Sequence, residues 1–134
     1  MSVGAPSRRE GRERALSLLY EAEAKDVTLP ALLDELPVPP TPFVTDLVVG
    51  VSRSQEKIDE LIGRYAVDWS VERMAVIDRN VLRLAVYEIL EHPDVPLAAV
   101  ISEAVELAKR YSTEESGRFV NGVLSGVARD ARPG

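Results

Sequence analysis

The 134-residue sequence predicts an all-α fold of about seven helices, and three observations support this expectation. Residues 77–90, IDRNVLRLAVYEIL, would place apolar side chains on nearly every side of a helix, which indicates a helix buried at the centre of a core. No segment alternates apolar and polar residues over the length of a strand. Prolines and helix-capping residues divide the remaining sequence into short helical segments.

The composition is typical of a globular protein, with 46% apolar and 28% charged residues, and the length predicts one domain. Cysteine is absent, which excludes disulfides, thiolate zinc sites and cysteine nucleophiles. The central apolar run is too short to cross a bilayer, and no apolar run of 18 residues exists in the sequence. Because no secretory signal precedes the first helix, we expect a cytoplasmic protein without a membrane segment.

The first predicted helix begins near residue 7 and continues to about residue 24. Ser7, followed by Glu10, matches a capping box, in which a hydroxyl and a carboxylate three residues apart satisfy the free N–H groups of a helix start. Apolar residues at helical spacing then form a buried stripe. The stripe consists of Ala15, Leu18, Leu19 and Ala22.

Three more helices complete the first half of the chain, which we place at residues 7–66. A short helix at 29–36 is followed by four prolines, which require an extended connector. Thr41 and the proline after it are expected to begin the third helix. Ser52 and Gln55 match a second capping box, which would open the fourth helix.

The second half is placed at residues 69–130 and begins with the only tryptophan, Trp69. We expect this large ring to pack between the two halves. After the central helix, two prolines precede another amphipathic helix. Ser112 and Glu115 match a third capping box, which would open the last helix.

The net charge is −6, and the acidic residues are concentrated in the middle of the chain. Residues 28–63 hold two basic and six acidic side chains, a net charge of −4. Such a surface could attract a basic protein partner. The alternative is a solvated face that only keeps the protein soluble.

One flank of the first helix combines arginines with an aromatic residue. Helical spacing places Arg9, Arg12 and Tyr20 within about 80° of one another. Cations that bind phosphates, beside a ring that stacks on an unpaired base, are the chemistry that RNA requires. Alternatively, Glu10 and Glu13 neutralise these arginines in surface ion pairs.

Residues that could support catalysis are few. His92, the only histidine, lies where a helix meets a proline and is read as a helix-terminal polar residue. Gly117 and Gly122 have the spacing of a phosphate loop, but the lysine and hydroxyl residue that the loop requires do not follow. Gly122 and Gly126, one turn apart, indicate a close helix neighbour, and Glu103 is read as part of an exposed face. We therefore expect no enzyme, cofactor or metal site.

Three stretches together resemble the NusB family of transcription antitermination factors. They are RREGRERALSLLYE at 8–21, IDRNVLRLAVYEIL at 77–90 with DVP at 94–96, and ISEAVELAKRYSTEESGRFVNGVL at 101–124. The resemblance covers about residues 8–128 in order, without a large insertion. Its last block is the most specific, because an apolar helix pattern alone does not require an Arg-Phe-Val-Asn-Gly sequence after a capped start.

The resemblance implies two small helical bundles packed across each other. It also implies binding to the boxA element of ribosomal RNA leader transcripts, jointly with NusE, a small-subunit ribosomal protein. The pair would assist RNA polymerase in an antitermination complex and support ribosomal RNA synthesis. The function implied is therefore assembly on RNA, without catalysis.

Carried over by position, the resemblance implies RNA-facing side chains on the first helix, at the start of the central helix and at the start of the last helix. These are Arg8, Arg9, Arg12 and Tyr20; Asp78; and Glu115, Arg118 and Phe119. Phe119 also borders the core stripe of its helix, so stacking on a base and packing in the core are both compatible with its position.

Two other interpretations remain at this point. A helical protein–protein adaptor without RNA binding would also fit the fold and the acidic surface. A homodimer that buries the arginine flank would mask RNA binding. A third, a NusB-like domain attached to an RNA cytosine methyltransferase, lacks support, since the chain has neither a cofactor-binding pattern nor a cysteine nucleophile.

Overall fold

The computed structural model describes residues 7–67 and 69–132, and this part of the chain is helical without any strand. The all-α prediction is therefore confirmed. The elements are α1 (Arg8–Lys25), α2 (Leu29–Glu35), α3 (Pro42–Arg53), α4 (Gln55–Tyr65), the 3-10 turn η1 (Val71–Arg73), α5 (Val76–Glu91), α6 (Leu97–Tyr111) and α7 (Glu114–Ala131). None of these helices is both long and apolar enough to span a bilayer.

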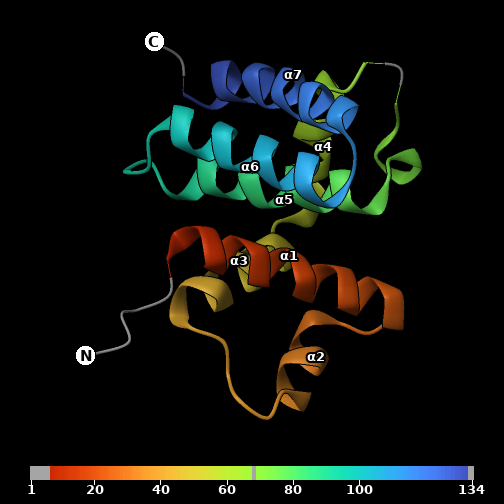
Figure 1. Cartoon of the computed structure of the whole chain (residues 1–134), viewed down its shortest axis with the longest axis vertical. Helices are drawn as coiled ribbons and strands as arrows, with labels where there is room; N and C mark the ends of the chain where they lie inside the picture. The colour runs from red at the N-terminus through yellow and green to blue at the C-terminus, as the bar shows by residue number, and fades with distance from the viewer. Residues whose placement is uncertain (1–6, 68, 133–134) are drawn as a thin grey trace.

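The helices form two groups, one above the other in Figure 1. Helices α1, α2 and α3 make the lower group, and α5, α6 and α7 make the upper group. Helix α4 rises from α3 and packs mainly against α5 and α7. The predicted division after residue 66 placed α4 with the first half, whereas its packing joins it to the upper group.

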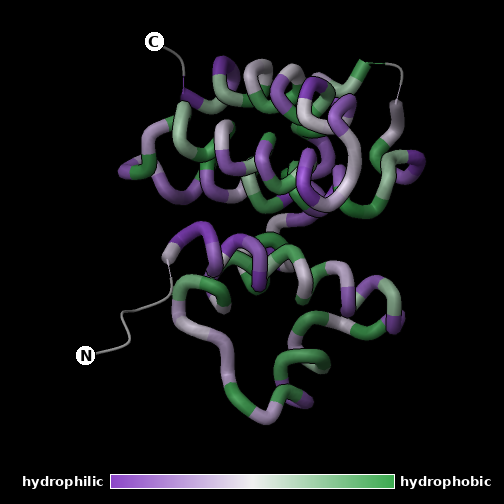
Figure 2. The backbone as a smooth tube through the Cα atoms, viewed as in Figure 1, coloured by the Kyte–Doolittle hydropathy of each residue, from purple (hydrophilic) through white to green (hydrophobic). Residues whose placement is uncertain are grey.

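Helix α5 is the centre of the molecule, as its apolar pattern predicts. It contacts α1 and α3 below and α4, α6 and α7 above. Ten consecutive residues, Asn80–Ile89, are buried, and the apolar side chains of both groups belong to one continuous core. Hydrophobic stretches of the helices accordingly alternate with hydrophilic ones along the tube in Figure 2.

The predicted starts of α1 and α3 are confirmed, and the predicted start of α4 is wrong. The side chains of Ser7 and Thr41 accept hydrogen bonds from the N–H groups three residues on, at the starts of α1 and α3. Ser52, expected to open α4, lies inside α3. The boundary falls at Ser54, which makes no side-chain cap, because the two helices follow each other directly.

The last helix starts one residue later than predicted. The N-cap of α7 is Thr113, whose hydroxyl accepts a hydrogen bond from the N–H of Ser116 at 3.0 Å. Ser112 is the last residue before this cap and closes α6. Ser112 and Thr113 are both hydroxyl residues that could cap a helix. Because Ser112 ends α6, Thr113 becomes the N-cap of α7.

Two predictions about packing have mixed outcomes. Trp69 does not pack between the halves; it is 54% exposed in the connection that leads to η1. Gly126 has the close neighbour that the glycine spacing predicts, since an added Cβ would lie 2.4 Å from the ring of Tyr65. Gly122 has no atom within 4 Å of such a Cβ, so it faces open space.

Candidate nucleic-acid interface

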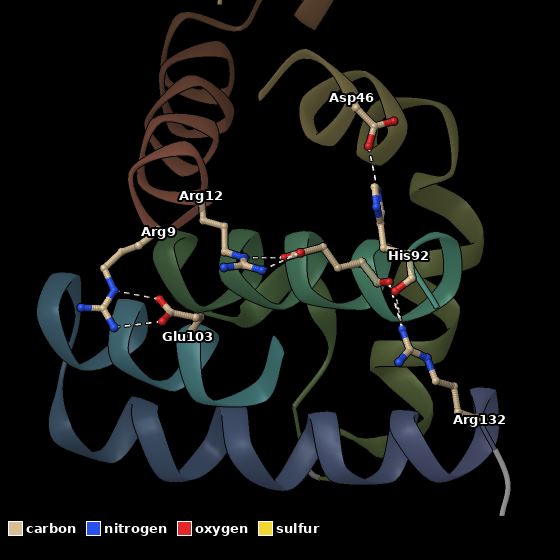
Figure 3. A network of polar contacts seen from close by, with 7 residues as sticks. Arg9, Arg12, Asp46, His92, Glu103 and Arg132 are labelled. Atoms are coloured by element: carbon tan, nitrogen blue, oxygen red, sulfur yellow. Dashed lines mark hydrogen bonds and ion pairs between the residues drawn. The ribbon is translucent and has the colours of Figure 1, made fainter. Parts of the chain in front are cut away.

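The arginines at the start of α1 do not share one environment. Arg8 and Arg9 are exposed, and the guanidinium of Arg8 lies 5.7 Å from the ring centre of Phe43. Arg9 donates to both carboxylate oxygens of Glu103 on α6, at 2.9 and 3.1 Å (Figure 3). These hydrogen bonds hold the pKa of the Glu103 carboxyl below its ordinary value. Arg9 is thus exposed to solvent, but its guanidinium is already paired with Glu103.

Arg12 is buried, whereas it was predicted to lie on the RNA-facing flank of the first helix together with Arg9 and Tyr20. Its side chain donates to both carboxylate oxygens of Glu88 on α5, at 2.7 and 2.8 Å (Figure 3). Arg12 is 6% exposed and Glu88 is 1% exposed. The cause is that α1 lies against α5, which covers the part of the flank that carries Arg12 and leaves Arg9 and Tyr20 exposed. Arg12 therefore joins the two groups of helices.

The alternative interpretation is that Glu10 and Glu13 form ion pairs with the arginines of the same helix. The structure does not show these pairs among the described residues. Glu13 accepts hydrogen bonds from Arg110 and from the hydroxyl of Tyr111, both at the end of α6, at 2.8 and 3.0 Å. Arg9 and Arg12 pair instead with carboxylates of α6 and α5. Charged contacts between α1 and the upper group therefore replace the predicted contacts within one helix.

Tyr20 lies beside an apolar groove between α1 and the end of α6. The groove has a volume of about 290 Å³ and is lined by Tyr20, Tyr111, Leu16 and Ile77, among others. Tyr20 and Tyr111 are 48% and 47% exposed, so both rings can meet a ligand. The sequence offered no signal for Tyr111, which closes a helix and reaches α1 only in the folded protein.

The start of α7 is held in place by Asp78 of α5. The hydroxyl of Ser116 donates to Oδ2 of Asp78 at 2.9 Å and lies 3.0 Å from the hydroxyl of Thr113. Asp78 is partly buried, and its Oδ1 accepts no hydrogen bond from the described residues. Asp78 therefore positions the first turn of α7, in addition to lining the surface that the resemblance predicts.

Glu115, Arg118 and Phe119 lie together on the first two turns of α7, as predicted. Glu115 and Arg118 are highly exposed and form only a loose contact of 4.0 Å. Phe119 is half-buried and packs against the core while it lines an open pocket of about 610 Å³. The same pocket is lined by Trp69 and Arg73, two residues that the sequence analysis did not assign to a site.

His92 has the structural role that the sequence predicts. It closes α5, and its Nε2 lies 2.7 Å from Oδ2 of Asp46 on α3 (Figure 3). Arg132 donates to the carbonyl of His92 at 2.8 Å and so covers the end of α5. Within the described segments, no three histidine or carboxylate side chains gather as they would around a metal ion.

Comparisons with known proteins agree on one family. A model described as the NusB family matches residues 9–129. The transcription antitermination protein NusB of Sorangium cellulosum is 44% identical over 130 residues, which cover 92% of this chain and 93% of that protein. NusB of Thermobifida fusca is 42% identical over 123 residues, which cover 89% of this chain and 87% of the relative.

Solved structures lead to the same group. The structure of T. maritima NusB superimposes with a TM-score of 0.86 at 39% identity, covering 97% of this chain and 96% of that one. A chain from the complex of antitermination factors NusB and NusE with double-stranded RNA gives a TM-score of 0.77 at 28% identity. That match covers 92% of this chain and 96% of the other.

Proposed function

The chain belongs to the NusB family, and from this premise we propose that it binds boxA RNA together with NusE as a transcription antitermination factor. One observation supports our choice of the RNA-binding surface. Two openings lie on either side of the start of α5, one reaching Ile77 and the other Asp78. Exposed rings line both openings and exposed arginines line one of them, which suits unpaired bases and phosphates.

We name this surface the α1–α7 face and define it by the residues that reach solvent there. The residues that line the openings are Tyr20, Tyr111, Trp69, Arg73, Arg118 and Phe119. The proposal adds Arg8 and Arg9, which are exposed at the start of α1 and line neither opening. Of the residues first implied by the resemblance, Asp78 and Glu115 border the face, and Arg12 lies beneath it. The proposed role of Arg12 is to fix α1 against α5, so that Arg8 and Arg9 are presented to RNA.

Charge explains why a partner would be needed. The protein carries a net charge of −6, and Arg9 is already paired with Glu103. Most of the affinity for RNA comes from phosphate contacts, so this protein alone should bind RNA weakly. A basic ribosomal protein that binds the acidic surface of residues 28–63 would add positive charge beside the RNA.

The proposed mechanism is assembly, without a chemical step. The protein and NusE would together hold boxA as it leaves RNA polymerase, and the complex would join the antitermination machinery. We accordingly propose a cytoplasmic location, where the transcript is made. The family and the fold support this mechanism, and the exposed rings support a preference for unpaired RNA over a duplex.

The test is a binding measurement with a labelled boxA RNA, its scrambled version and a boxA duplex, each with and without NusE. We expect preference for single-stranded boxA, strengthened by NusE. Arg9→Ala should weaken binding, whereas Arg129→Ala, which removes the same charge from the far end of α7, should not. Equal, weak binding of all three RNAs by monomeric protein with NusE present would contradict the proposal.

Two other functions would give different results in the same experiment. A protein–protein adaptor would bind NusE or another protein without retaining RNA in either complex. A homodimer that uses the α1–α7 face would bind RNA more weakly as the protein concentration rises. Sedimentation of the same samples separates these outcomes.

A further inference from the structure

The pocket beside α7 contains a tryptophan that the core does not use. Trp69 is 54% exposed, and its ring lines the open pocket of about 610 Å³ together with Phe119, Arg118 and Arg73. We propose that Trp69 is the stacking platform for an unpaired nucleobase of single-stranded RNA in this pocket, a role that the resemblance does not assign to it. This inference rests on the proposed function and assigns it a specific site.

The exposure of Trp69 needs an explanation, because aromatic residues are scarce in this chain. They make up 5% of the sequence, and a tryptophan is ordinarily one of the most buried residues. In the described part of the chain the one ring pair joins Tyr87 and His92, so Trp69 and Phe119 do not stack on each other. Both can offer a surface to a flat ligand.

The lining of the pocket is partly polar, with the guanidinium groups of Arg73 and Arg118 and the carboxylates of Asp78 and Glu115, and this favours a nucleotide over an apolar ligand. Arg73 and Arg118 are both exposed at its wall. Arg118 has only the loose contact with Glu115, and Arg73 forms no ion pair with the described residues. Two uncommitted guanidinium groups beside a ring can hold the phosphates that flank a stacked base. The pocket volume is within the range of about 300–1,000 Å³ that small ligands occupy.

The side of the pocket that α7 forms is held firmly, which favours recognition of a base. Ser116 is buried and hydrogen-bonded to Asp78, and these two residues join the start of α7 to α5. Met74 is buried beneath the same pocket and anchors η1 to the core. Phe119 and Arg118 are therefore presented from a fixed helix, and a bound base would need little rearrangement there.

Because Trp69 is the only tryptophan, its fluorescence reports on this pocket alone. We would titrate the protein with single-stranded boxA RNA and with the duplex, with and without NusE, and measure affinity in parallel with labelled RNA. Trp69→Phe supplies the fluorescence background in each complex. We expect quenching by the single strand and little change with the duplex.

Three variants complete the test. Trp69→Ala should weaken binding of the single strand roughly 5- to 150-fold, the range for loss of one stacked base. Trp69→Phe keeps a ring and should lose less than about fivefold. Val67→Ala removes a neighbouring exposed side chain that does not line the pocket and should leave the affinity unchanged.

The outcomes separate this inference from the function on which it rests. If wild-type protein binds boxA but the fluorescence and the affinity of Trp69→Ala do not change, the inference is wrong and the function stands. If NusE alone quenches Trp69 and RNA adds nothing, the pocket binds protein and the inference is wrong. If the wild type binds no RNA, the function and the inference fail together.

Discussion

Arg9 and Arg12 lie one turn apart on α1, yet their carboxylate partners give them different roles. Arg9 pairs with Glu103 at the surface, where RNA phosphates can compete for the guanidinium. Arg12 pairs with Glu88 in the interior, where no phosphate can reach it without disrupting the contact of α1 with α5. The helical spacing of the arginines predicts their shared flank but not the carboxylates that other helices bring to it.

Removal of the Glu103 charge should strengthen RNA binding. In Glu103→Gln, Arg9 loses a bidentate carboxylate partner and becomes free for a phosphate, so affinity for boxA should rise about two- to fivefold. The dependence of binding on salt should also steepen by about 0.7 in the log–log slope for each added phosphate contact. Glu106→Gln, one turn away and exposed, is the control with the same change of charge. Equal binding by wild type and Glu103→Gln would show that RNA does not use Arg9.

Substitution of Arg12 should act through stability. Arg12→Ala leaves the buried carboxylate of Glu88 without its partner, which should cost about 3–5 kcal/mol of unfolding free energy in urea. The double variant Arg12→Met/Glu88→Leu removes both charges and should recover most of that loss. If Arg12→Ala were fully stable but deficient in RNA binding, Arg12 would be a direct contact after all.

At the scale of the helices, α7 connects the proposed site to the core. Its first turns carry Arg118 and Phe119, and its middle packs against α4 through Gly126 and Tyr65. The glycine spacing in the sequence predicts a close neighbour but cannot tell which glycine has it, because the position of α4 is a tertiary property. The cap at Thr113 was missed by one residue for a similar reason, since the end of α6 determines it.

The two glycines of α7 should respond to alanine in opposite directions. Gly126→Ala places a Cβ against the Tyr65 ring and should lower the unfolding free energy by about 1–3 kcal/mol. Gly122→Ala enters open space in the same helix and should raise it by about 0.5–1 kcal/mol through helix propensity. Urea denaturation of both variants checks this, and a shared sign would contradict the packing described.

At the scale of the whole molecule, two groups of helices share one core through α5 and are also joined by polar contacts. The hydroxyl of Tyr87 on α5 donates to Asp46 on α3 at 2.8 Å, beside the contact of Asp46 with His92. Much of this architecture could be predicted: the buried run of α5, the capped starts of α1 and α3 and the all-α class are local patterns. The exposure of Trp69 and the partners of Arg9 and Arg12 could not, because they depend on how distant segments meet.

The contact of Tyr87 predicts a loss of stability at alkaline pH. Burial, followed by the hydrogen bond to Asp46, raises the pKa of Tyr87 to about 12 from an ordinary value of about 10. Between these values the unfolded chain releases the proton and the folded protein keeps it, so the unfolding free energy falls as pH rises. Tyr87→Phe should be less stable than wild type near pH 8, and the difference should shrink toward pH 12. A constant difference across that range would contradict the assignment.

The central claim is that RNA binds the α1–α7 face, and ultraviolet cross-linking of wild-type protein to boxA RNA in the presence of NusE tests it most directly. Mass spectrometry of the cross-linked peptides identifies the contacted residues without any substitution. We predict cross-links at Tyr20, Trp69 and Phe119, whose rings line the two openings beside the start of α5. Cross-links confined to α2 and α3, on the other side of the lower group, would contradict the account.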